Sequence, residues 1–164
     1  MNGALSLRNC QRARAVDLRL LRRIVQALLR QTCPHEKFDL SVCIVAGPEM
    51  TRLNESFLQH RGSTDVITFD YGEGASPGLL HGEIFVCLDE AVSQARRFHT
   101  TWQSEVVRYI VHGVLHLRGY DDRDSHSRGR MKRAEDVLVR RLGRQFGCRG
   151  LAQTQAYRAR PHKS

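Results

Sequence analysis

Two histidines and an aspartate are spaced so that they could hold one metal ion. His112 and His116 are four residues apart, so on a helix both imidazoles lie on one face, about one turn apart. Two imidazoles placed in this way can bind the same zinc ion at about 2.0–2.1 Å. Gly119 can end the helix in a left-handed conformation, and the chain can then turn back so that Asp122 reaches the ion. Three protein ligands leave one position of the zinc ion open for water, as in catalytic sites.

The same spacing of ligands occurs in the metzincin proteases, in which the residue after the first histidine is a glutamate that acts as the general base. Here that residue is Gly113, which has no side chain and cannot move a proton. The last ligand position holds Asp122, where the proteases have a histidine. The pattern therefore predicts a metal site and argues against a peptidase.

Residues 112–122 resemble the signature of the YbeY family of zinc-dependent endoribonucleases, H-G-x-L-H-L-x-G-Y-D-H, and differ from its specified positions only at the last. Other blocks resemble the family in the same order along the chain, over about residues 5–145. These blocks are Leu53-Asn54 with Phe57, the run from Thr64 to Phe69, Gly82-Glu83-Ile84, Gln94-Ala95, and Met131 with Glu135.

The resemblance implies an enzyme, a metal-dependent endoribonuclease that is specific for single-stranded RNA. It implies one Zn²⁺ ion per chain, held by His112, His116 and Asp122. It further implies a cytoplasmic protein that acts in late 16S rRNA 3′-end processing and in ribosome biogenesis. The implied partners are ribosomal RNA and the small ribosomal subunit, and no membrane is involved.

Three further residues are expected to contact the substrate. Thr64 and Asp65 belong to the upstream block, where they could orient water or a ribose hydroxyl, and Asp65 could equally serve as a structural acceptor. Arg118 lies beside the histidine motif and could hold a phosphate, or could form only part of a solvated surface. Asp121, next to a proposed ligand, is expected to support the metal site from outside. No residue is assigned as a general base.

The chain departs from the family pattern at two positions. Asp122 replaces the third histidine ligand, and an anionic ligand makes the metal less Lewis-acidic. His126, four residues further on, is an alternative third ligand if the loop bends differently. Leu58 replaces an arginine that the resemblance leads us to expect there, and Arg61, which is nearby in sequence, could substitute for it. These departures keep open an alternative function, a non-catalytic ribosome-assembly factor with a structural metal site.

The composition fits a cytosolic protein with a polyanionic partner. The 164 residues carry a formal net charge of +9, which suits the phosphate backbone of a nucleic acid. The five cysteines are scattered and odd in number, which predicts reduced thiols, with Cys43 and Cys87 buried in apolar runs. The first residues lack the apolar core of a signal peptide, and no apolar run is long enough to cross a membrane.

The hydrophobic pattern predicts a mixed α/β domain at residues 1–148 and a basic polar tail at 149–164 that we expect to be disordered. We expect one sheet of about four strands, about five helices, and a central helix that carries the two histidines. Asp89 is expected to cap the helix that follows it, and Thr100 or Thr101 the histidine helix. The order of the strands does not follow from the sequence. The strands are expected at 5–9, 38–46, 64–71 and 81–88, a loop at 72–77, and the helices at 16–30, 48–58, 90–98, from about 101 through the histidines, and 127–143.

Overall fold

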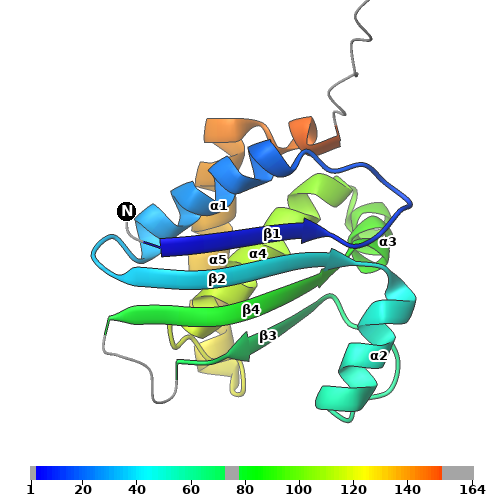
Figure 1. Ribbon diagram of the computed structural model, residues 1–164, viewed down its shortest axis with the longest axis horizontal. Coiled ribbons are helices and arrows are strands. Elements are labelled where there is room, and N and C mark those ends of the chain that lie inside the picture. The colour runs from blue at the N-terminus through cyan, green and yellow to red at the C-terminus, as the bar shows by residue number, and fades with distance from the viewer. Residues whose placement is uncertain (1–2, 73–77, 153–164) are drawn as a thin grey trace, which may run out of the picture.

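The computed structural model describes residues 3–72 and 78–152, which form one sheet covered by helices (Figure 1). The elements follow one another as β1 (Gly3–Asn9), α1 (Leu18–Thr32), β2 (Lys37–Val45), α2 (Gly47–Phe57), β3 (Val66–Asp70), β4 (Leu79–Cys87), α3 (Leu88–Phe98), α4 (Trp102–Leu117), α5 (Ser125–Phe146) and a 3-10 helix, η1 (Cys148–Ala152). The predicted fold class is confirmed, as one four-stranded mixed sheet with five α-helices.

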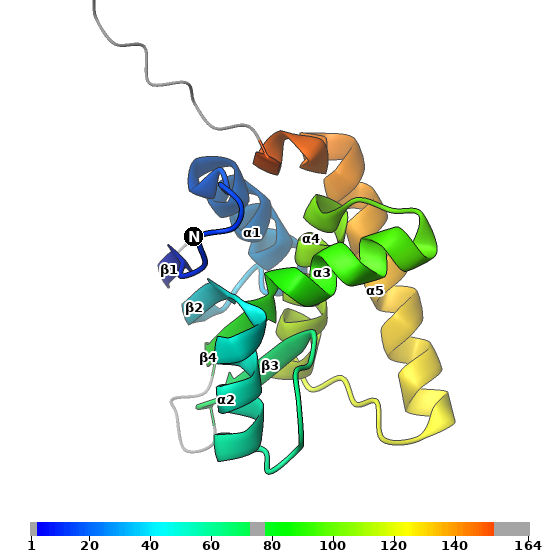
Figure 2. The same ribbon diagram turned by 90° about the vertical axis from the view of Figure 1, so that its right-hand side faces the viewer.

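The strands lie in the order β1-β2-β4-β3. β1, β2 and β4 are parallel, and β3 pairs with β4 in the antiparallel direction, so that β3 forms an edge. α1, α4 and α5 cover one face of the sheet (Figures 1 and 2). Alternate residues of β2 point into the core between the sheet and these helices, because successive side chains of a strand face opposite ways. They are Phe38, Leu40, Val42 and Ile44, all buried.

The histidine helix α4 is central, as predicted, because it packs against β3, β4, α3, α5 and η1. It lies so close to the sheet that only glycine fits at position 113. A Cβ atom added to Gly113 would stand 2.8 Å from Cδ1 of Ile84 in β4. Gly82 of β4 is equally constrained, since a Cβ atom there would stand 2.6 Å from Cδ2 of Leu117. These two glycines let α4 run along β4 and carry its histidines toward the edge strand.

Side-chain caps begin three of the helices. Asp17 caps α1, Thr101 caps α4 as predicted, and Asp124 caps α5. The predicted cap of α3 is wrong: α3 begins at Leu88, so Asp89 already lies inside its first turn. The carboxylate of Asp89 instead accepts a hydrogen bond of 2.6 Å from the backbone N–H of Gly47, at the start of α2. Asp89 therefore connects the first turns of two helices.

The cysteines are all free in the structure, and Cys43 and Cys87 are buried as predicted. The structure adds one contact that the sequence did not indicate. Cys10 follows β1 and Cys43 lies in β2, and their Sγ atoms are 2.8 Å apart. None of the helices within residues 3–72 and 78–152 has the length and apolar character needed to cross a membrane.

The folded part of the chain extends beyond residue 148, where we expected the domain to end. Residues 148–152 form η1, whose Leu151 is 0% exposed. The carbonyl oxygen of Leu151 accepts a hydrogen bond of 2.9 Å from the backbone N–H of Asp17, which begins α1. The rest of the expected tail, residues 153–164, lies outside the described residues, as do residues 73–77 of the expected loop.

Replacing Leu151 with alanine tests whether η1 belongs to the core. Because the side chain is fully buried, Leu151→Ala should lower the free energy of unfolding by about 2–5 kcal/mol in urea denaturation. Arg149→Ala, at an exposed position of the same short helix, should change it by no more than about 0.5 kcal/mol. Equal stability of the two variants would show that η1 contributes nothing to the core.

Candidate metal centre

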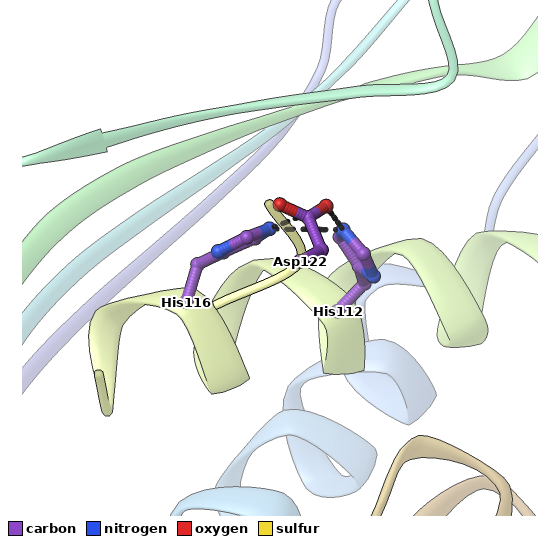
Figure 3. Close-up of side chains that lie close together, drawn as sticks. All are labelled: His112, His116 and Asp122. Atoms are coloured by element: carbon purple, nitrogen blue, oxygen red, sulfur yellow. Dashed lines mark hydrogen bonds and ion pairs between the residues drawn. The ribbon is translucent and has the colours of Figure 1, made fainter. Parts of the chain in front are cut away.

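The structure brings the side chains of His112, His116 and Asp122 together (Figure 3). The two Nε2 atoms of the histidines are 3.1 Å apart. Oδ2 of Asp122 lies 3.8 Å from Nε2 of His112 and 3.5 Å from Nε2 of His116. Ligand atoms bound to one tetrahedral zinc ion at about 2.0–2.1 Å are separated by about 3.3–3.4 Å. The three atoms are therefore spaced closely enough to share one ion.

The helix end that positions Asp122 forms as the sequence predicted. α4 ends at Leu117, and Gly119 adopts a φ of 90°, a conformation that residues with a side chain rarely take. The backbone N–H of Tyr120 then bonds back to the carbonyl oxygen of Leu115 at 3.0 Å, which satisfies a carbonyl left open by the helix end. This reversal carries the chain back over the histidine face, where Asp122 meets the imidazoles.

Hydrogen bonds fix which nitrogen of each imidazole points to the centre. Nδ1 of His116 lies 3.1 Å from the carbonyl oxygen of Tyr120, and Nδ1 of His112 lies 3.0 Å from Oε2 of Glu135. A carbonyl or carboxylate oxygen can only accept, so both Nδ1 atoms donate. In the neutral imidazoles both Nε2 atoms then carry lone pairs, which face each other and the carboxylate of Asp122. A cation between these three atoms would relieve their mutual repulsion, so the residues fit a metal ion.

Glu135 on α5 is a buried carboxylate that connects His112 to a second ion pair. Its side chain is 8% exposed, and Oε1 accepts a hydrogen bond of 2.7 Å from Arg108. Burial alone would raise the pKa of Glu135, but the hydrogen bonds from His112 and Arg108 outweigh it and hold the pKa below its usual value. Burial alone would lower the pKa of His112, but the hydrogen bond to Glu135 outweighs it and raises that pKa. Glu135 therefore stays ionised and orients the His112 ring.

The sequence pattern predicts no function for Glu135, although it contains a signal. Glu135 shares the inward face of α5 with Met131, Leu138 and Leu142, which are all buried. A carboxylate within such an apolar stripe must have a partner, because an unpaired buried charge is costly. The identity of that partner depended on how α5 packs on α4.

The side chains of His112, His116 and Asp122 line a pocket of about 680 Å³ between β3 and the loop that follows α4. Thr64 and Asp65, both expected at the site, line this pocket, although they precede β3 and are not part of the strand. Oδ1 of Asp65 accepts a hydrogen bond of 2.8 Å from the backbone N–H of Val66. Leu58, the position at which the chain departs from the expected family pattern, also lines the pocket.

The structure does not bring Arg118 into this pocket. Its Nη1 atom instead donates to both carboxylate oxygens of Glu36, at 2.6 and 2.5 Å. Arg123 lines the pocket instead, and its Nε atom is held by Asp121 at 3.0 Å. His126 is exposed on α5 and is not part of the cluster of potential ligands, so the structure brings Asp122 rather than His126 to the histidines.

The pocket carries more negative than positive charge, in contrast to the whole chain. Besides the two histidines, its lining contains one arginine, Arg123, and four carboxylates, which are Asp65, Asp70, Asp121 and Asp122. The net charge of +9 is therefore located elsewhere on the molecule. A phosphodiester could enter such a pocket only with a cation there to offset the carboxylates.

Removing the carboxylate behind His112 should weaken metal binding without removing a ligand. We expect Glu135→Ala to reduce zinc affinity about 10–100-fold, because the His112 ring loses its orientation and its hydrogen-bond acceptor. Glu135→Gln, which keeps an acceptor, should have a smaller effect. Competition with a chromogenic chelator measures both, and Asp136→Asn, which also contacts Arg108 but lies outside the cluster, is the matched control. Equal affinities for Glu135→Ala and the control would contradict the role of Glu135.

Comparisons with known proteins identify the family to which the chain belongs. The family described as Endoribonuclease YbeY matches residues 7–143 of the chain. A protein from Chlorobium luteolum named Endoribonuclease YbeY is 36% identical over 85% of this chain and 98% of its own length, and one of the same name from Chlorobium phaeovibrioides is 36% identical over 85% and 90%. The solution structure of TM1509 from Thermotoga maritima has a TM-score of 0.63 at 23% identity, covers 98% of this chain and 100% of its own, and supports the fold alone. With its family match and these relatives, the chain belongs to the YbeY family.

Proposed function

We propose that this protein is a zinc-dependent endoribonuclease that cleaves single-stranded RNA. The observation that supports this function best is the convergence of the two Nε2 atoms and Oδ2 of Asp122 in one pocket, within a chain of the YbeY family. The relatives' name, endoribonuclease, supplies the reaction and the class of substrate. The formal net charge of +9 is consistent with a polyanionic substrate.

The ligand set favours a catalytic rather than a structural zinc ion. Within the described residues the cluster offers three ligand atoms, whereas structural zinc sites normally have four protein ligands. When bound, the ion would polarise a phosphoryl oxygen and lower the pKa of a water molecule. Asp122 contributes a negative charge that a histidine would not, so it should weaken both effects.

Other residues of the pocket could orient the substrate and move a proton. Oδ1 of Asp65 is occupied by the N–H of Val66, and Oδ2 has no hydrogen-bond partner within the described part of the chain. Oδ2 can therefore accept a proton from water or from a ribose hydroxyl. The guanidinium of Arg123, held at the pocket by Asp121, is placed to contact a phosphate oxygen.

We further propose that the substrate is 16S rRNA, cleaved late in maturation near its 3′ end, in the cytoplasm and in association with the small ribosomal subunit. This part of the proposal rests on resemblance to the family. Leu58 and Asp122 favour a second function as the alternative, because both replace residues that the resemblance leads us to expect. In that function the protein would assist ribosome assembly without cleaving RNA, and the metal ion would only stabilise the fold.

Metal analysis tests the ligand assignment directly. Elemental analysis of the purified protein should find one zinc ion per chain, and almost none in the His112→Ala/His116→Ala double variant. Asp122→Ala should lose less, because two imidazoles remain. His126→Ala is the matched control and should keep full occupancy. Loss of metal from His126→Ala with retention by Asp122→Ala would show that His126 is the third ligand.

Cleavage of an unstructured RNA separates the two functions. Wild-type protein should cleave it, and a chelator or the double histidine variant should abolish cleavage. Asp122→His should retain activity with a lower pH optimum, because a neutral ligand leaves more charge on the metal and lowers the pKa of bound water. Asp65→Asn should lower kcat while metal content stays unchanged. If wild-type protein cleaves no RNA with any divalent metal, the assembly function replaces the enzymatic one.

A further inference from the structure

A second hollow lies outside the metal pocket, between α3 and the segment that follows β1. It has a volume of about 660 Å³, and its lining includes Arg14, Arg96 and Arg97. A smaller hollow of about 290 Å³ continues it, shares Arg14 and Arg96, and adds Trp102 at the start of α4. We call these two hollows together the arginine groove. In Figure 2, α3 faces the viewer, with the segment after β1 on one side and β3 below.

The arginines of this groove are exposed and are not paired with acidic side chains. Arg14, Arg96 and Arg97 form no ion pair within the described residues, whereas Arg108 and Arg118 are held by carboxylates. One acid lines the groove, Asp89, and its Oδ2 atom already accepts the N–H of Gly47 at 2.6 Å. The groove therefore carries a positive charge, and its guanidinium groups can bind an anion.

Aromatic rings lie beneath two of these guanidinium groups. The guanidinium of Arg14 stands 5.8 Å from the ring centre of Trp102, and that of Arg97 stands 5.3 Å from the ring centre of Phe98, which is 60% exposed. Stacking on a ring restrains a guanidinium while leaving the N–H groups at its edge available to phosphate oxygens. Basic groups combined with accessible aromatic rings are typical of surfaces that bind single-stranded nucleic acid.

The metal pocket needs such a surface nearby. Its lining has four carboxylates and one arginine, so it repels the phosphates that flank a scissile bond. α4 connects the two places, because Trp102 lies in the groove and His112, ten residues further on, lies in the pocket. At a rise of about 1.5 Å per residue, these positions are about 15 Å apart along the helix axis. One RNA strand of several nucleotides is long enough to contact both.

We propose that the arginine groove binds the phosphate backbone of the same RNA strand that enters the metal pocket, an inference that rests on the proposed endoribonuclease function. Arg14, Arg96 and Arg97 each neutralise a phosphate, and Trp102 and Phe98 restrain the guanidinium groups. Binding energy then comes largely from the groove, while the pocket supplies the reacting groups.

The test compares two sets of three substitutions that remove the same charge. Arg14→Gln/Arg96→Gln/Arg97→Gln alters the groove, and Arg140→Gln/Arg141→Gln/Arg144→Gln alters three exposed arginines of α5. Binding of the zinc-loaded proteins to an unstructured RNA of roughly 20 nucleotides is followed by fluorescence anisotropy, between about 50 and 200 mM salt. Thermal unfolding and zinc content confirm that each variant is folded. If the groove variant is unstable, Arg96→Gln alone repeats the test.

We expect the groove variant to bind RNA at least roughly tenfold more weakly at about 50 mM salt, and its plot of log affinity against log salt to lose about 2 units of slope, since each single-strand contact contributes about 0.7. The α5 variant should stay close to wild type. An equal loss in both variants, or no loss in the groove variant, would overturn the inference. Because the readout is binding, absence of cleavage by wild-type protein would count against the proposed enzymatic function alone.

Discussion

The close packing of α4 on β4 is the constraint on which the metal pocket depends. Ile84 of β4 presses against the backbone of α4 at Gly113, and any side chain there would collide with it. His112 precedes this contact and His116 follows it by three residues, so the packing fixes where both imidazoles lie relative to β3, with which they share the pocket. The same contact explains why no glutamate can follow the first histidine, as it does in the metzincins. The packing thus leaves no room for a protease-type base at position 113.

Hydrogen bonds at the two Nδ1 atoms then fix how each imidazole is oriented. The carbonyl oxygen of Tyr120 holds Nδ1 of His116, and Glu135 holds Nδ1 of His112. The first contact is local, since it forms as the chain reverses after Gly119. The second comes from α5, so the orientation of His112 depends on how the last long helix packs against α4. A change in that packing would alter the orientation of His112 through its hydrogen bond with Glu135.

Features that depend on near neighbours in sequence could be predicted, and features that depend on tertiary packing could not. The histidine pair, the stop at Gly119 and the return to Asp122 all lie within eleven residues, where helix geometry decides the outcome. The sequence suggested that Asp89 would cap its own helix, but the neighbouring start of α2 offered the N–H of Gly47. Arg118 was expected at a phosphate, but its partner, Glu36, is 82 residues away in the chain. The strand order and the contact of Glu135 with His112 could not be predicted for the same reason, because both depend on tertiary packing.

The arrangement of charges around the ligands also has a physical reason. An arginine placed against Asp122 would form an ion pair with it and compete with a metal ion for the same carboxylate oxygens. The two arginines nearest in sequence are each held by another acid, Arg118 by Glu36 and Arg123 by Asp121. Within the described residues the ion pairs of Asp122 are therefore limited to the two histidines. A protein that must bind both a cation and a polyanion therefore benefits when its unpaired arginines lie away from the metal-ligating residues. A positively charged surface separate from the pocket meets that requirement.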